Sequence, residues 1–185
     1  MLIYVHGFNS SGRSAKAGQL HDWMASHAPD QRFLSPDLPH RPAEALALLD
    51  NVIAGASGEQ VKLVGSSLGG FYATVLSERL GVKSALINPA VRPHRLLEAA
   101  LGPQRFWHSD QTYEFTRQHL AELAAVEPTD LQHPERLFLL VETGDEVLDY
   151  RDAVAYYSGC RQKVVEGGNH SFQSFAAMIP DILAF

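Results

Sequence analysis

The chain has 185 residues, enough for one domain with a substantial core, and its 45% hydrophobic and 19% charged residues are ordinary for a globular protein. A formal net charge of −6 disfavours nucleic acid and anionic membranes as partners, because both repel an acidic protein. The single cysteine, Cys160, excludes an internal disulfide, and no apolar run is long enough to cross a membrane. We therefore expect a cytoplasmic protein that acts on a small molecule.

Strand and helix patterns alternate along the whole chain. Short apolar or β-branched runs bounded by glycine, proline or polar residues predict strands near residues 2–5, 31–35, 60–65, 83–88, 136–142 and 162–166. Helical patterns occupy residues 15–26, 42–54, 68–80, 94–101, 112–126, 150–157 and 174–183. This alternation is typical of an α/β fold with about six mainly parallel strands flanked by helices. Since no linker divides the chain, residues 1–185 are expected to form a single domain.

The segment 91–134 is the longest interval between two predicted strands. It contains the aromatic residues Phe106, Trp107, Tyr113 and Phe115. One interpretation makes these side chains a small lid over a site. The other makes them ordinary core residues that pack the segment onto the sheet. Both interpretations stay open from the sequence.

A strand, a sharp turn and a helix are predicted around the stretch LVGSSLGGFYAT, residues 63–74. A nucleophilic serine on such a turn needs a glycine two residues before it and another two residues after it, because the backbone there leaves no space for side chains. Ser67 meets this requirement with Gly65 and Gly69. The neighbouring Ser66 does not. Because the GxSxG pattern also occurs by chance, the strand before it and the helix after it support the prediction that Ser67 is a nucleophile.

A serine nucleophile needs a base that takes its proton and an acid that orients the base. Of the nine histidines, His170 lies directly after the last predicted strand, in VVEGGNHSF, where glycines allow a close-turning loop. In enzymes whose nucleophilic serine lies on such a strand–turn–helix, called a nucleophile elbow, the chain order is serine, acid, histidine. That order leaves His133 and His170, and His133 precedes the strand that carries the acid candidates. We predict His170 as the base.

The acid should follow a strand that lies between the serine and the histidine in sequence. The stretch LFLLVETGDEVLDY, residues 137–150, supplies Asp145 and Asp149. Asp145 lies at the end of the predicted strand, from which a carboxylate can reach the histidine loop, and we predict it as the acid. We interpret Asp149 as the N-cap of the next helix, while it remains the alternative acid.

A tetrahedral intermediate also needs two backbone donors for its oxyanion. The amide after the nucleophile, that of Leu68, lies at the start of a predicted helix whose dipole favours negative charge. The second donor should come from the loop after the first strand, HGFNSSGRS, and we predict the amide of Phe8. His6 in this loop is interpreted as a structural residue that ties the loop by hydrogen bonds.

The chain resembles the α/β-hydrolase superfamily, and more closely the YqiA-type bacterial esterases, in the stretches LIYVHGFNSSGRSAKA, LVGSSLGGFYAT, INPAVRP, ETGDEVLDYRDAVAYY and VVEGGNHSF. The segment 101–135 is the least similar. The resemblance implies carboxylic ester hydrolysis through Ser67, Asp145 and His170. It also implies a compact sheet that lacks the first two strands of larger hydrolases and has the spatial order 2-1-3-4-5-6.

We therefore expect a serine esterase that hydrolyses small-molecule esters with small to medium acyl groups, without a metal or an organic cofactor. No histidine and carboxylate cluster has the spacing of a zinc site. One alternative is a hydrolase of acyl-CoA or other thioesters, in which Arg92, Arg95 and Arg105 would bind phosphates. Another alternative is a non-catalytic protein that uses the same fold to bind a ligand. The sequence does not predict the oligomeric state.

Overall fold

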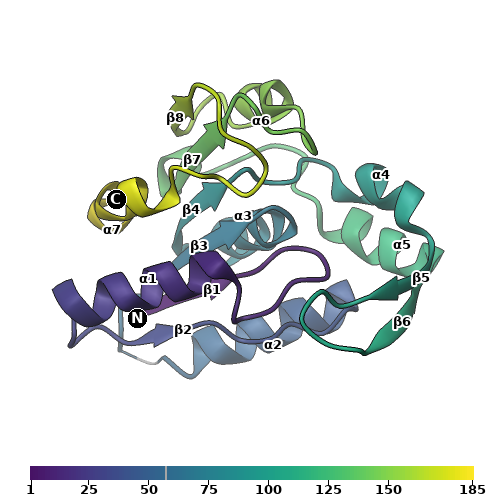
Figure 1. Cartoon of the computed structure of the whole chain (residues 1–185), viewed down its shortest axis with the longest axis horizontal. Helices are drawn as coiled ribbons and strands as arrows, with labels where there is room; N and C mark the ends of the chain where they lie inside the picture. The colour runs from purple at the N-terminus through teal and green to yellow at the C-terminus, as the bar shows by residue number, and fades with distance from the viewer. Residues whose placement is uncertain (57) are drawn as a thin grey trace.

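The computed structural model describes residues 1–56 and 58–185. Within these residues a six-stranded sheet is built from β1 (Leu2–Val5), β2 (Phe33–Leu34), β3 (Lys62–Ser66), β4 (Lys83–Ile87), β7 (Leu137–Glu142) and β8 (Arg161–Val165). All neighbouring pairs are parallel, and the spatial order is β2-β1-β3-β4-β7-β8 (Figure 1). Numbered along the chain, these strands follow the expected order 2-1-3-4-5-6, and the predicted α/β class is confirmed.

The helices connect the strands and cover the sheet. They are α1 (Ala15–His27), α2 (Pro42–Ala54), α3 (Leu68–Leu80), α4 (Pro93–Leu96), α5 (Arg117–Val126), α6 (Tyr150–Tyr156) and α7 (Phe175–Ala184). Two short 3₁₀ turns lie at Leu97–Ala100 and Pro134–Arg136. Proline at the first position of α2 suits its start, because that position needs no N–H donor. No helix in the described part of the chain combines the length and the apolar character that a membrane span requires.

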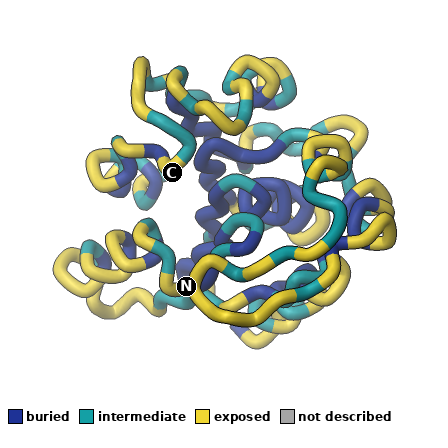
Figure 2. Tube along the Cα trace, turned by 45° about the vertical axis from the view of Figure 1, so that its right-hand side comes forward, coloured by how far each residue is buried: buried dark blue, intermediate teal, exposed yellow. Residues whose placement is uncertain are grey.

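The core has two layers because successive strand residues point to opposite faces of the sheet. In β1, Ile3 and Val5 belong to the layer under α2, α3 and α6, whereas Leu2 and Tyr4 belong to the layer under α1 and α7. All four side chains are buried. In Figure 2 the buried trace accordingly runs through the centre of the molecule, while the outer turns of the helices are exposed. The strands are therefore covered on both faces, as in other parallel sheets.

The segment between β4 and β7 differs from its prediction. The expected helix at residues 112–126 is wrong in its first part, because Thr112–Phe115 is strand β6 and pairs antiparallel with β5 (Gly102–Arg105). Thr116 then forms a capping box with His119, so that α5 begins only at Arg117. The expected helix at residues 94–101 is likewise shorter, since α4 ends at Leu96 and a 3₁₀ turn follows.

The β5–β6 hairpin contacts the loop between β1 and α1 through Asn9. The backbone oxygen of Asn9 accepts a hydrogen bond from the amide of Trp107 at 2.9 Å. Its side-chain oxygen accepts from the hydroxyl of Tyr113 at 2.6 Å, and its side-chain nitrogen donates to Gln104 at 2.9 Å. Segments about a hundred residues apart in the sequence therefore lie side by side (Figure 1).

The start of α3 packs against the ends of β1 and β3 without any space for side chains. A Cβ atom on Gly69 would lie 2.0 Å from the backbone oxygen of Val5, and one on Gly65 would lie 2.3 Å from the backbone oxygen of Gly69. Both distances are far below van der Waals contact. The two glycines of the GxSxG pattern are therefore required by backbone packing.

Two glycine substitutions test this packing. Gly69→Ala should destabilise the protein by about 2–3 kcal/mol or more, because the added methyl group overlaps backbone atoms that cannot move alone. Gly18→Ala should instead stabilise it by about 0.5–1 kcal/mol, since Gly18 lies inside α1 with nothing near its Cβ position. Urea unfolding followed by circular dichroism measures both. Similar unfolding free energies for the two variants would contradict the packing argument.

Candidate active site

Ser67 occupies a strained backbone position between β3 and α3. Its φ of 55° and ψ of −120° lie in a region that residues with side chains rarely adopt. Backbone hydrogen bonds hold it there: its N–H donates to Ile87 at 3.0 Å, and its carbonyl accepts from Gly70 at 2.9 Å, Ala90 at 3.1 Å and Phe71 at 3.4 Å. The side chain thereby leaves the helix surface and faces the carboxyl edge of the sheet.

The structure brings Ser67, His170 and Asp145 together. The Ser67 hydroxyl lies 3.1 Å from Nε2 of His170. Nδ1 of the same ring lies 2.8 Å and 3.0 Å from the two carboxylate oxygens of Asp145. These contacts join residues 103 and 25 positions apart in the chain. The distances are those of a nucleophile, a base and an orienting acid.

Asp145 is held as a carboxylate. Its side chain is only 2% exposed, and its Oδ1 accepts the amides of Val147 at 2.9 Å and Leu148 at 2.8 Å. Burial raises its pKa, but the hydrogen bonds from His170 and the two amides outweigh this effect and lower the pKa below its usual value. An ionised carboxylate can only accept, so the proton of a neutral His170 ring lies on Nδ1. Nε2 then faces the Ser67 hydroxyl with its lone pair.

Asp149 has the separate role predicted for it. Its side chain accepts the amide of Arg151 at 3.0 Å and caps the N-terminus of α6. The same carboxylate binds the guanidinium of Arg151. Among the described residues, its hydrogen bonds go to Arg151 alone, and none joins it to His170.

The amides of Phe8 and Leu68 lie on two sides of Ser67. Gly7 packs against the serine, since a Cβ on Gly7 would lie 3.2 Å from Cβ of Ser67, and Phe8 is the next residue. Leu68 is the first residue of α3, whose N-terminus has no side-chain cap. No described residue accepts a hydrogen bond from either amide. Both donors are therefore open to a ligand at the positive end of the helix.

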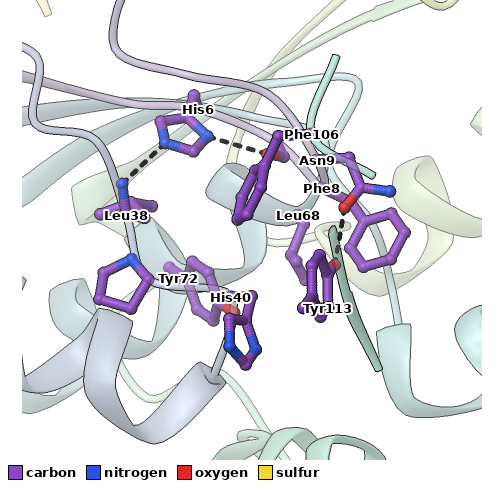
Figure 3. A pocket seen from close by; sticks show the side chains of 11 residues that line it. His6, Phe8, Asn9, Leu38, His40, Leu68, Tyr72, Phe106 and Tyr113 are labelled. Atoms are coloured by element: carbon purple, nitrogen blue, oxygen red, sulfur yellow. Dashed lines mark hydrogen bonds between the residues drawn. The ribbon is translucent and has the colours of Figure 1, made fainter. Parts of the chain in front are cut away.

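His6 fixes the loop that carries Phe8. Its Nε2 accepts the amide of Leu38 at 2.9 Å, and its Nδ1 contacts the carbonyl of Gly7 at 2.9 Å (Figure 3). An amide can only donate, so the ring proton lies on Nδ1 and is donated to Gly7. Burial lowers the pKa of His6, which keeps the ring neutral at neutral pH. The predicted structural role of His6 is confirmed.

A small cavity is lined by Phe8 and Leu68, the two residues that carry the open amides (Figure 3). Phe8 and Leu68 line one side, and the other walls include Leu38, Pro39, His40, Tyr72, Phe106 and Tyr113. Its volume, counted as space open to the centre of a water molecule, is about 20 Å³. On that measure one water needs roughly 10–15 Å³. The cavity therefore has space for a group little larger than a methyl.

A second cavity lies beside the first, because Leu38 and Phe106 line both. It has a volume of about 250 Å³, and its lining includes the charged or polar side chains of Arg13, Asp37 and His108. The larger cavity is thus more polar than the smaller one. Leu38 and Phe106 lie between the two cavities.

For the aromatic residues of segment 91–134 the sequence left two interpretations open, a lid over a site and core residues that pack the segment onto the sheet. The structure divides the residues between them. Phe106 and Tyr113 line the small cavity, and Phe115 is buried in the core. Trp107 is 71% exposed. The lid role of the segment stays a prediction.

Two residues of this region were not predicted as part of the site. Glu142, the last residue of β7, and Asn88, which follows β4, hydrogen bond the loop that carries His170. The sequence feature that could have indicated Glu142 is a charged residue at the end of an apolar strand.

Within residues 1–56 and 58–185, no three histidine, cysteine, aspartate or glutamate side chains are grouped as they would be to hold a metal ion.

Comparison with known proteins places the chain in a family. The family model described as "Uncharacterised protein family (UPF0227)" matches residues 1–185. A UPF0227 protein of Shewanella sp. (strain ANA-3) is 27% identical over 195 residues, covering 100% of this chain and 98% of that protein.

Solved structures of low sequence identity share the fold. The α/β hydrolase domain-containing protein 10 from mouse has a TM-score of 0.75 at 14% identity, over 99% of this chain and 88% of the other. A monoacylglycerol lipase of Paleococcus ferrophilus has a TM-score of 0.69 at 15% identity, over 99% of this chain and 93% of the other. The protein therefore belongs to the UPF0227 family, and its fold is the one seen in α/β hydrolases.

Proposed function

We propose that the protein is a serine esterase that hydrolyses carboxylic esters with a small acyl group. The observation that carries this proposal is the unbroken chain of hydrogen bonds from Asp145 through His170 to Ser67, beside two open amides. A binding protein has no need of a serine in a strained position that faces a histidine and a carboxylate. The name of the structurally similar lipase agrees with hydrolysis.

In the proposed reaction, Ser67 Oγ attacks the ester carbonyl while His170 Nε2 takes its proton. The carbonyl oxygen becomes an oxyanion and accepts from the amides of Phe8 and Leu68. Asp145 stabilises the imidazolium. His170 then protonates the leaving alcohol, and an acyl-enzyme remains. Water repeats these steps, releases the acid and restores the serine.

The small cavity supports a short acyl group. Phe8 and Leu68 line it, so an acyl chain attached to Ser67 would lie next to it. About 20 Å³ accommodates an acetyl methyl group but not a long chain. The larger polar cavity is placed to receive the alcohol part of the ester.

The thioester alternative receives less support. Arg92 lies 3.8 Å from Glu127, and Arg105 pairs with Asp110. Neither of these arginines nor Arg95 lines the two cavities. Assays of acyl-CoA compounds beside simple esters distinguish the two substrate classes. Labelling by a fluorophosphonate probe distinguishes either from a non-catalytic binding protein.

Two adjacent serines provide the first test. Ser67→Ala should lower kcat by about a millionfold, the typical loss for a nucleophilic serine. Ser66→Ala should keep most of the activity, because Ser66 is a buried residue of β3 and lacks the elbow position. Steady-state kinetics and fluorophosphonate labelling measure both variants. An active Ser67→Ala beside an inactive, folded Ser66→Ala would refute the assignment.

Two carboxylates provide the second test. Asp145→Asn should leave the protein folded but lower kcat by about 10⁴-fold, because an amide favours the wrong imidazole tautomer and cannot stabilise the imidazolium. Asp149→Asn should keep both activity and stability, since asparagine also caps helices well. Rates and thermal melts decide between them. A folded but inactive Asp149→Asn beside an active Asp145→Asn would assign the acid role to Asp149 instead.

The wall of the small cavity provides the third test. Phe106→Ala should raise kcat/KM for a butyrate ester relative to an acetate ester by about tenfold or more, because longer acyl chains gain space. Trp107→Ala is the matched control, since its side chain is 71% exposed and does not line the cavity. Steady-state kcat/KM values, measured separately for the p-nitrophenyl acetate and butyrate esters, give the ratio. Equal ratios in Phe106→Ala and wild type would place the acyl group elsewhere.

A further inference from the structure

Glu142 is a carboxylate buried inside the protein, with an exposed fraction of 0%. It ends β7, three residues before Asp145. No lysine or arginine among the described residues forms an ion pair with it. Burying a carboxylate is costly unless hydrogen bonds replace the lost water. Its presence at this position therefore requires an explanation.

Backbone amides of one loop replace that water. Oε2 of Glu142 accepts the amides of Asn169 at 2.8 Å and Gln173 at 2.9 Å, and Oε1 accepts the amide of Ser174 at 2.8 Å. Burial raises the pKa of Glu142, but the hydrogen bonds from Ser174, Asn169 and Gln173 outweigh it and lower the pKa. Glu142 is thus an anion at neutral pH. The residues that donate to it flank His170 on both sides.

Asn88 holds the carbonyls of the same loop. Its side-chain nitrogen donates to the carbonyls of Asn169 at 3.1 Å and His170 at 3.2 Å. Its side-chain oxygen accepts the amide of Glu142 at 3.0 Å. Asn88 is itself buried, at 2% exposed. The ends of β4 and β7 therefore bind the histidine loop through the side chains of Asn88 and Glu142, and the Asn88 side chain also binds the backbone of Glu142.

The loop needs such partners because it forms neither helix nor strand between β8 and α7. Its backbone turns through left-handed positions at Gly167, Gly168 and Phe172. Lys16 of α1 adds one more hydrogen bond, which it donates to the carbonyl of Ser171 at 2.8 Å. Side chains from other elements thus set the path of this loop.

We propose that Glu142 is a positioning residue that, together with Asn88, fixes the backbone of the histidine loop so that His170 meets Ser67 and Asp145. The proposal rests on the esterase function proposed above. A reacting group misplaced by about 1 Å can cost roughly 100-fold in rate. Loss of the anchor should therefore lower kcat without a change in the affinity for the ester.

Gly168 supplies independent evidence for this contact. A Cβ on Gly168 would lie 1.9 Å from Oε2 of Glu142, so a side chain there is incompatible with the carboxylate. Gly167 has a similar φ, 78° against 68°, but nothing lies near its Cβ position. The two glycines form a matched pair that separates backbone strain from contact with Glu142.

The first experiment replaces the carboxylate by an amide. In Glu142→Gln one acceptor oxygen becomes an NH₂ group that faces N–H donors, so at least one loop amide loses its partner. We expect kcat per active site, counted by fluorophosphonate titration, to fall by about 100-fold while KM stays unchanged. Glu166→Gln is the matched control and should behave as wild type, because Glu166 is exposed and makes no hydrogen bond with a described residue.

The second experiment uses the glycine pair. Gly168→Ala should reproduce the loss of kcat, whereas Gly167→Ala should show only the mild destabilisation of a strained backbone. The double variant Glu142→Gln with Gly168→Ala should be hardly slower than either single variant, because both remove the same contact. Additive losses would mean that Gly168 acts independently of Glu142.

A stability role alone gives a different result. Glu142→Gln would then melt at a lower temperature while kcat per titrated site equals that of wild type, and this outcome overturns the proposal. Proton NMR tests the geometry without any turnover, through the low-field signal of the proton between His170 Nδ1 and Asp145. The signal should broaden or vanish in Glu142→Gln and persist in Glu166→Gln. If wild type neither reacts with the probe nor hydrolyses esters, the esterase function fails, and the NMR comparison still decides the role of Glu142.

Discussion

Helix α3 approaches the ends of β1 and β3 so closely that backbone atoms alone occupy the contact, as the 2.0 Å distance from a Gly69 Cβ to the Val5 oxygen illustrates. This approach forces the chain into the left-handed conformation at Ser67 and exposes the N-terminal amide of α3. It also brings Gly7 against the serine and Phe8 beside it. The positions of Ser67 and of the amides of Phe8 and Leu68 thus depend on this one steric contact. Hydrogen bonds and charges then adjust the geometry of these groups.

The remaining groups come from the carboxyl ends of parallel strands, where loops of an α/β sheet meet. β4 contributes Asn88, and β7 contributes Glu142 and Asp145. His170 follows β8, the edge strand. Because this edge strand has a neighbour on one side only, its loop cannot be held by another strand end beyond it. Side chains from β4 and β7 supply that support across the sheet, which explains why a buried anion occurs in an otherwise apolar strand end.

The sequence predicted those features whose cause is local. The patterns at residues 42–54 and 68–80 give the bounds of α2 and α3 to the residue, and the GxSxG spacing with the chain order leads to the three residues that meet in the structure. The prediction of a helix over residues 112–115 is wrong because pairing with the distant β5 decides their conformation. Glu142 and Asn88 were missed for a similar reason. Their partners are backbone groups of a remote loop, which leave no side-chain motif to read.

The contacts of Asn9 have a consequence for the assembly of the site. The loop that carries Phe8 follows the first strand, but its partners Gln104, Trp107 and Tyr113 come from the β5–β6 hairpin, more than half the chain later. Contacts of such long sequence separation cost loop-closure entropy and slow folding. β5 and β6 form a separate two-stranded sheet, and Phe115 of β6 is buried in the core. The placement of the Phe8 amide therefore depends on contacts that exist only when the hairpin is packed against the loop after β1.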